Sequence, residues 1–278
     1  MAVPKMIVKD LDCTLLDINK KCSSRTKEYL QKLKSGGKIV VIATGRVLNS
    51  AIKITEGATF ANYIISNTGS IIYDVENKKE IFRSNISNKD INKICSLYNE
   101  KFEYIDICDS MYYNRYTNNE YFKKILCVEK IKNKEKFLKT CENAVHIRIS
   151  TKSNEDIEEV SNIIKSEIPF LDIKIMQDSF SNKKYIEIYQ QNISKYKGVQ
   201  KIAEIEGIEN KDIIAFGDSL NDIDMIKNCG IGVAMGNSLE RIKEIANYTT
   251  ISHNQNGVIE FLEKIYGGNN ETSSTKSE

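Results

Sequence analysis

The sequence predicts an α/β protein in which a doubly wound parallel sheet is interrupted by an inserted α+β domain. Short, uniformly apolar runs alternate with helical segments at both ends of the chain, as in parallel strands that are buried on both faces. The middle of the chain instead carries strands that alternate between apolar and polar residues. A length of 278 residues suits about two domains with well-formed cores.

A strand, a helix and a second strand open the chain. The apolar run 6–8 has strand length and leads directly into two carboxylates. A helix follows Ser23, a favoured N-cap residue, and ends at the glycines 36–37. Residues 38–42 form a second buried strand, so we expect a right-handed parallel βαβ unit.

The third strand, at 63–65, continues through a turn into a short extension at 71–73. From residue 81 the chain becomes richer in Asn, Lys, Glu and Tyr. We assign 81–189 to the inserted α+β domain, whose alternating strands predict an antiparallel sheet with one solvent-exposed face. Its expected strands are 104–108, 111–115, 146–150, 171–175 and 185–188, and its expected helix is 154–166.

The α/β pattern resumes after residue 189. Its expected elements are helices at 194–205, 238–246 and 258–266 and strands at 213–216 and 231–235. The parallel-sheet domain is therefore discontinuous, spanning 1–80 and 190–266, and its architecture is Rossmann-like. Residues 267–278 are small, polar and without periodicity, so a disordered tail is expected.

Composition narrows the range of functions. The net charge of +2 gives no electrostatic case for nucleic acid or an anionic membrane as the main partner. No run reaches the length of a membrane span, and the first residues lack the apolar region of a signal peptide, so a cytoplasmic location is expected. The seven cysteines show no Cys-x-x-Cys spacing and there are only two histidines, His146 and His253, so no zinc site is expected and the thiols are expected to be reduced and mostly buried. Neither histidine has a partner that the sequence identifies.

Polar side chains follow three of the buried strands. Asp10 and Asp12 follow the first, Thr44 follows the second, and Asp218, Asn221 and Asp222 follow the 213–216 strand. Because the carboxyl ends of parallel strands share one edge of a sheet, these groups are expected to converge. Converging carboxylates require a hard cation, and oxygen ligands without His or Cys suit Mg²⁺.

Asp10 and Asp12 are two residues apart, so in extended backbone both side chains point the same way. This spacing suits Asp10 as a nucleophile and Asp12 as a general acid and base. An Asp-x-Asp triplet by itself is also common in surface turns. The occurrence of three polar clusters in this order after buried strands favours a functional site over a surface turn.

With these motifs, the chain resembles the haloacid dehalogenase (HAD) superfamily, and specifically its Cof-type sugar-phosphatase branch with a large α+β (C2B-type) cap. The motifs that carry the resemblance are Asp-Leu-Asp-Cys-Thr at 10–14, Ile-Ala-Thr-Gly-Arg at 42–46, Ser-Lys at 194–195 and Gly-Asp-Ser-Leu-Asn-Asp at 217–222. The resemblance covers residues 5–265, with the cap matching by pattern only.

The resemblance implies a Mg²⁺-dependent phosphomonoester hydrolase that acts on small phosphorylated metabolites, with sugar phosphates the leading class, through an aspartyl-phosphate intermediate. It implies these roles: Asp10 as nucleophile and metal ligand, Asp12 as acid and base and as a metal ligand through its backbone carbonyl, Asp218 as metal ligand, Asp222 as metal support, and Thr44, Lys195 and Asn221 as phosphate-binding residues. Lys195 and Lys197 both fit the lysine position, and helix length favours Lys195. A phosphomutase of the same superfamily and a non-catalytic phosphate-binding or regulatory module remain alternatives.

Cys13 stands where this family usually has Gly or Asp. A side chain is tolerated at that position if φ is negative. We expect Cys13 to act as a small neutral spacer. A sharper hypothesis is that the Cys13 thiol, which lies beside the nucleophile in the sequence, makes the enzyme sensitive to peroxide. The neighbouring carboxylates should raise the pKa of the thiol, which argues against this hypothesis.

Overall fold

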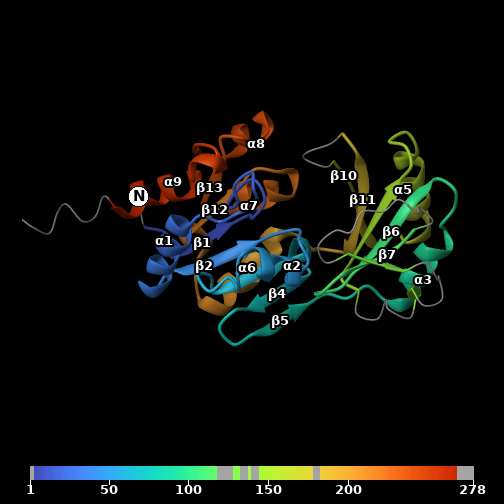
Figure 1. Cartoon of the computed structure of the whole chain (residues 1–278), viewed down its shortest axis with the longest axis horizontal. Coiled ribbons are helices and arrows are strands. Elements are labelled where there is room, and N and C mark those ends of the chain that lie inside the picture. Colours follow the sequence, from blue (N-terminus) through green and yellow to red (C-terminus); the bar gives the residue numbers. More distant parts are fainter. Residues whose placement is uncertain (1–2, 118–127, 132–136, 139–143, 178–181, 268–278) are drawn as a thin grey trace, which may run out of the picture. The chain divides into compact units, whose positions relative to one another are not determined.

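The computed structural model describes residues 3–117, 128–131, 137–138, 144–177 and 182–267 (Figure 1). The contacts within the chain divide it into two compact units. The first comprises Met1–Ala43, Ile54–Tyr63 and Val199–Glu278, and the second comprises Thr44–Lys53 and Ile64–Gly198. The α-helices with described bounds are α1 (Ser24–Ser35), α2 (Leu48–Ile54), α3 (Asn88–Ser96), α5 (Asp156–Glu167), α6 (Lys195–Glu206), α7 (Ile223–Asn228), α8 (Glu240–Ile245) and α9 (Gly257–Gly267).

The described strands form two sheets (Figure 1). The first has the order β14-β13-β12-β1-β2-β3-β4-β5. Its strands are β1 (Met6–Lys9), β2 (Ile39–Ala43), β3 (Tyr63–Ser66), β4 (Ile71–Asp74), β5 (Lys79–Arg83), β12 (Ile213–Gly217), β13 (Ile231–Ala234) and β14 (Tyr248–Thr249). The second has the order β10-β11-β9-β6-β7-β8. Its strands are β6 (Phe102–Cys108), β7 (Tyr113–Tyr116), β8 (Val128–Ile131), β9 (His146–Thr151), β10 (Leu171–Gln177) and β11 (Lys184–Gln190).

Strand β1 lies between β2 and β12 and is parallel to both. All four of its residues are buried, which explains why this part of the sequence is uniformly apolar up to Lys9. Lys9 is in register with Ile42 of β2 and with Phe216 of β12. The carboxyl ends of these three strands are therefore level at one edge of the sheet, as the sequence predicts.

Helix α1 shows how local signals set the element boundaries. The hydroxyl of Ser23 accepts a hydrogen bond from the backbone N–H of Thr26, and the helix ends at Gly36. Helix α8 is shorter than the predicted 238–246 segment, and α9 begins one residue before the predicted 258. The expected tail lies outside the described residues apart from Gly267.

The second sheet is mainly antiparallel, and only the β7–β8 pair is parallel among its described pairings. One of its faces packs on α3 and α5 through isoleucines from β6, β9 and β11. Helix α3 and strand β8 are additional to the predicted elements. The parallel sheet and the separate antiparallel sheet confirm the α/β fold with an α+β insertion.

The opposite face of the antiparallel sheet differs from the expectation. Its residues are polar, but Asp106, His146 and Glu187 are buried rather than in contact with water. Asp106 pairs with the guanidinium of Arg115, which stacks over the ring of Tyr104 with its Cζ 3.5 Å from the ring centroid. The alternation of apolar and polar residues correctly predicts which residues share a face of the sheet. The prediction that the polar face is exposed to solvent is wrong at the centre of that face.

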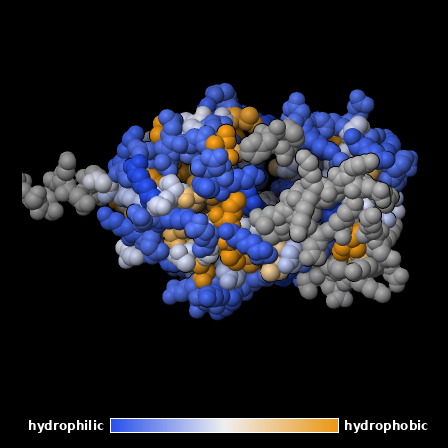
Figure 2. All heavy atoms as spheres, viewed as in Figure 1, coloured by the Kyte–Doolittle hydropathy of each residue, from blue (hydrophilic) through white to orange (hydrophobic). Residues whose placement is uncertain are grey.

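The face of the molecule seen in Figure 2 is mostly hydrophilic, with hydrophobic residues in small separate patches. Within the described ranges, the structure contains no helix with the length and apolar character needed to cross a bilayer. Cys22, Cys108 and Cys229 are buried thiols, as expected.

Candidate active site

Three carboxylates converge in the first unit. Asp10 directly follows β1, and its backbone N–H donates to the carbonyl of Phe216 at 3.0 Å, which extends the β1–β12 pairing by one residue. Carboxylate oxygens of Asp10, Asp218 and Asp222 all lie within 4.8 Å of one another. Three carboxylates at this spacing repel one another unless a cation compensates them, and an all-oxygen donor set suits a hard divalent ion.

Asp222 shapes the loop that presents Asp218. It is fully buried, and its Oδ2 accepts hydrogen bonds from the backbone N–H groups of Asp218 at 3.1 Å and Ser219 at 3.0 Å. The bond from Ser219 is one half of a capping box at the short 3₁₀ helix Leu220–Asp222, and its other half runs from the backbone N–H of Asp222 to the side chain of Ser219. The Oδ1 atom of Asn221 lies 2.7 Å from the Ser219 hydroxyl, so this side chain is tied to the same loop.

Thr14 orients the second carboxylate. Its buried hydroxyl donates to Oδ1 of Asp218 at 2.8 Å, across 204 positions in the chain. This threonine belongs to the motif at 10–14, but the motif by itself does not indicate its contact with Asp218. Asp12 is partly exposed, and its carboxylate does not belong to the three-carboxylate group.

Cys13 has a backbone φ of 57°, in the left-handed region. The condition of a negative φ, on which its side chain was expected to be tolerated, is therefore not met. The carboxamide of Asn237 holds this conformation, because its Nδ2 donates to the Cys13 carbonyl at 2.9 Å while its Oδ1 accepts from the backbone of His253 at 3.0 Å. Burial, followed by the charges of Asp218 and Asp12, raises the pKa of the Cys13 thiol to about 12, which argues against peroxide sensitivity.

Thr44 and Lys195 belong to the second unit, where both lie beside the turn Asn67–Gly69. The carbonyl of Thr44 accepts from the backbone N–H of Thr68 at 3.1 Å, and its hydroxyl accepts from the N–H of Arg46 at 3.1 Å. Gly69 packs on the backbone of Ser194, the residue before Lys195. Lys195 is only 1% exposed at the start of α6, whereas Lys197 is exposed, and this difference favours Lys195 as the functional lysine.

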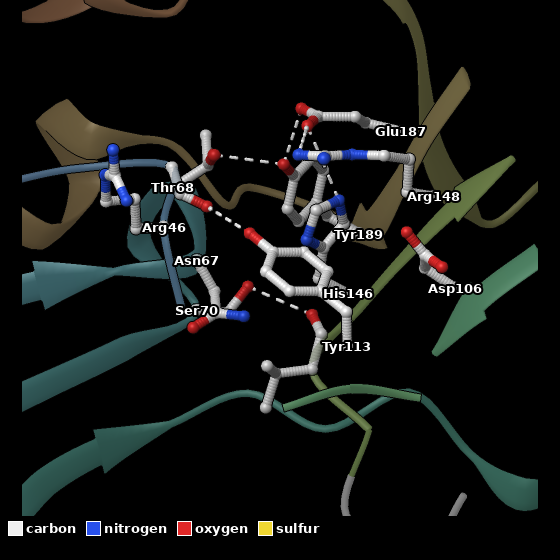
Figure 3. Close-up of polar contacts among 12 residues, drawn as sticks. Arg46, Asn67, Thr68, Ser70, Asp106, Tyr113, His146, Arg148, Glu187 and Tyr189 are labelled. Carbon is white, nitrogen blue, oxygen red and sulfur yellow. Dashed lines mark hydrogen bonds and ion pairs between the residues drawn. The ribbon is translucent and has the colours of Figure 1, made fainter. Parts of the chain in front are cut away.

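The second unit also contains a buried polar cluster that was not predicted from the sequence (Figure 3). His146 and Arg148 lie on β9, and Glu187 and Tyr189 lie on β11. The rings of His146 and Tyr189 stack with their centroids 4.4 Å apart. Glu187 accepts a 2.6 Å hydrogen bond from the Tyr189 hydroxyl, and its other oxygen lies 3.3 Å from Nη2 of Arg148. The available signal was the pair of sequences His-Ile-Arg and Glu-Ile-Tyr, which place these side chains on one face.

Comparison with known proteins agrees with this organisation. The family model of the haloacid dehalogenase-like hydrolases matches residues 7–262. A 5-amino-6-(5-phospho-D-ribitylamino)uracil phosphatase of Bacillus subtilis is 26% identical over 279 residues, with 95% of this chain and 98% of the relative covered.

Solved structures show the same fold. A haloacid dehalogenase-like hydrolase from Bacteroides thetaiotaomicron superposes with a TM-score of 0.78 at 25% identity, covering 95% of this chain and 100% of the other. A HAD subclass IIB sugar phosphatase superposes with a TM-score of 0.73 at 21% identity, covering 95% and 99%. The chain therefore belongs to the haloacid dehalogenase-like hydrolases and is an enzyme of the phosphatase branch of that superfamily.

Proposed function

We propose that this phosphatase is a Mg²⁺-dependent phosphomonoester hydrolase that acts on small phosphorylated metabolites, with sugar phosphates as the leading class, through an aspartyl phosphate on Asp10. The observation that supports the proposal most strongly is the convergence of the Asp10, Asp218 and Asp222 carboxylates beside the end of β1. The names of the relatives, a phosphatase of a phosphorylated ribityl compound and a sugar phosphatase, point to the same substrate class.

The residues fit a magnesium ion. Asp10, Asp218 and Asp222 would hold it, together with the backbone carbonyl of Asp12. When bound, the ion would neutralise the carboxylates and let an anionic phosphate approach an anionic nucleophile. Thr14 would keep Asp218 in position through its 2.8 Å hydrogen bond.

The protein groups supply the rest of the chemistry. A carboxylate oxygen of Asp10 attacks phosphorus, and the bond between phosphorus and the ester oxygen breaks. The carboxylic acid of Asp12 gives its proton to the departing oxygen, which leaves as an alcohol. Asp12 then takes a proton from water, and the resulting hydroxide attacks phosphorus of the aspartyl phosphate, so that inorganic phosphate leaves and Asp10 is regenerated.

The remaining residues bind charge on the transferred group. Thr44, Lys195 and Asn221 would hold the phosphoryl oxygens. In a loose transition state, positioning and electrostatics supply most of the rate enhancement, so a buried cation such as Lys195 is well suited to this role.

Hydrolysis of p-nitrophenyl phosphate with and without Mg²⁺ tests the proposal. We expect metal-dependent turnover in the wild type, its loss in Asp10→Asn, and a reduction of about 10²- to 10⁴-fold in Asp12→Asn. Asp224→Asn is the matched control, because this exposed aspartate on α7 lies outside the carboxylate group. Full turnover by Asp12→Asn would contradict the acid–base role. Binding of Mg²⁺ and phosphate without hydrolysis of any phosphomonoester would favour a binding module, and turnover that requires a bisphosphorylated activator would favour a mutase.

A further inference from the structure

The turn Asn67–Gly69 has an unusual backbone for its sequence. Asn67 has a φ of 48°, and Thr68 has a φ of 57° and a ψ of 22°, so two consecutive residues with side chains are left-handed. The left-handed conformation costs free energy for any L-residue, and a β-branched residue such as threonine rarely adopts it. Backbone of this kind persists only where the surrounding structure holds it, and it is concentrated at functional sites.

A buried tyrosine holds the side chain of Thr68 (Figure 3). The hydroxyl of Tyr189 lies 2.9 Å from Oγ1 of Thr68 and 2.6 Å from Oε2 of Glu187. Glu187 also lies 3.3 Å from Nη2 of Arg148, which favours its ionised form, and an ionised carboxylate only accepts hydrogen bonds. The single phenol proton is therefore donated to Glu187, and the Thr68 hydroxyl donates to the phenol oxygen.

Tyr189 is itself held by the antiparallel sheet. It is 0% exposed on β11, and its ring stacks on the ring of His146 from the adjacent strand β9. Glu187 stands two residues earlier on β11 and is in register with Arg148 of β9. The phenol oxygen is therefore fixed by contacts within the sheet, and its hydrogen bond fixes the side chain of Thr68.

The same turn adjoins the two residues of the second unit to which we assign phosphate binding, Thr44 and Lys195. The backbone N–H of Thr68 donates to the carbonyl of Thr44 at 3.1 Å. At Gly69 the turn packs on the backbone of Ser194, the residue before Lys195. A change in the conformation of the turn would therefore shift both phosphate-binding residues, and a displacement of about 1 Å in such a group can lower a rate by about 10²-fold.

We propose that Tyr189 is a positioning residue for phosphate binding: by holding Thr68 in its left-handed conformation, it keeps these two phosphate-binding residues in place. Tyr189 acts through the turn and not by touching the phosphate. A glycine at residue 68 would adopt the same backbone without a side-chain bond, so the turn depends on Tyr189 only because it carries a threonine there. The inference rests on the proposed phosphatase function and adds to it a residue outside the sequence motifs.

Inhibition of p-nitrophenyl phosphate hydrolysis by inorganic phosphate, measured with Mg²⁺, tests the proposal. Tyr189→Phe and Thr68→Val each remove one hydroxyl of the pair, and each should raise the inhibition constant of phosphate by about 10-fold. In the Thr68→Gly background, Tyr189→Phe should change this constant by less than about 2-fold, because glycine keeps the left-handed backbone without the hydroxyl pair. A general loss of stability would not depend on residue 68 in this way.

Tyr104→Phe is the matched control, because it removes a phenol hydroxyl from the same sheet, where the Tyr104 ring lies over Arg115. It should leave the inhibition constant unchanged. Urea unfolding of each variant shows whether it is folded. A wild type that neither hydrolyses p-nitrophenyl phosphate nor binds phosphate overturns the proposed function. With an active wild type, this inference alone is overturned if the folded variants keep the wild-type inhibition constant, or if Tyr189→Phe raises it equally in the Thr68→Gly background.

Discussion

Replacing Gly69 by alanine tests the packing that joins the turn 67–69 to the lysine at the start of α6. Gly69 has a φ of +112°, which L-residues rarely adopt. A Cβ atom there would lie 2.2 Å from the carbonyl oxygen of Ser194 and 2.7 Å from its carbonyl carbon. Both are backbone atoms, so they cannot rotate away as the end of a flexible side chain would.

Gly37 provides a matched comparison. Its φ is +81°, but a Cβ atom there would have no neighbour within 4 Å. Gly37→Ala should therefore lower the free energy of unfolding by about 1–2 kcal/mol, the cost of left-handed backbone alone. Gly69→Ala should cost that amount plus about 1–3 kcal/mol for overpacking, which gives about 2–5 kcal/mol in total.

Urea unfolding followed by circular dichroism measures both values, and equal slopes would show that the denatured states are comparable. The turnover of p-nitrophenyl phosphate should fall more in Gly69→Ala than in Gly37→Ala, because relief of the clash moves Ser194 and with it Lys195. Equal destabilisation by the two alanines, or full activity in Gly69→Ala, would refute this reasoning.

Cys13→Gly should raise the free energy of unfolding by about 1 kcal/mol, because φ at this residue is 57°, and a decrease in urea unfolding would contradict this. Arg115→Met should lower the free energy of unfolding by about 3–5 kcal/mol, because it leaves the buried Asp106 carboxylate uncompensated. The double variant Arg115→Met, Asp106→Leu should recover most of this loss. A double variant as unstable as the single one would argue against the ion-pair explanation. Burial lowers the pKa of His146 to about 4, so as the pH falls from about 6.5 towards about 4 the unfolded chain binds a proton at His146 that the folded chain excludes. The free energy of unfolding should therefore decrease in this pH window, and it should decrease less steeply in His146→Phe. The same dependence of the unfolding free energy on pH in both proteins, measured by urea unfolding, would contradict the burial of a neutral imidazole.

Local sequence signals predicted the strands whose carboxyl ends form the sheet edge next to Asp10. The apolar run before Asp10 is a buried strand, and the order β12-β1-β2 makes its end level with the ends of both neighbours. Both facts follow from periodicity and from the handedness of βαβ units. Helix α3 was not predicted, although the sequence carries a signal for it, namely the Ser87 cap followed by apolar residues at Ile91 and Ile94.

Other features depend on contacts that no local pattern records. The left-handed conformation of Cys13 is held by Asn237, which lies 224 positions away in the chain. Alternation placed His146 and Glu187 on one face of the antiparallel sheet, but burial of that face depends on tertiary packing that periodicity does not report. Lys195 is buried and Lys197 is exposed, a difference between the two candidate lysines that their sequence positions do not report.

The most direct test of the central proposal is detection of the phosphoryl group on Asp10. Enzyme turning over p-nitrophenyl phosphate with Mg²⁺ would be quenched in acid, digested, and examined by mass spectrometry for phosphate on the peptide that contains Asp10 and Asp12. We predict a labile phosphoryl group on Asp10 that is absent from Asp10→Asn and from unreacted enzyme. Rapid turnover with no phosphoryl group on this peptide at any quench time, and with undiminished activity in Asp10→Asn, would contradict nucleophilic catalysis by Asp10.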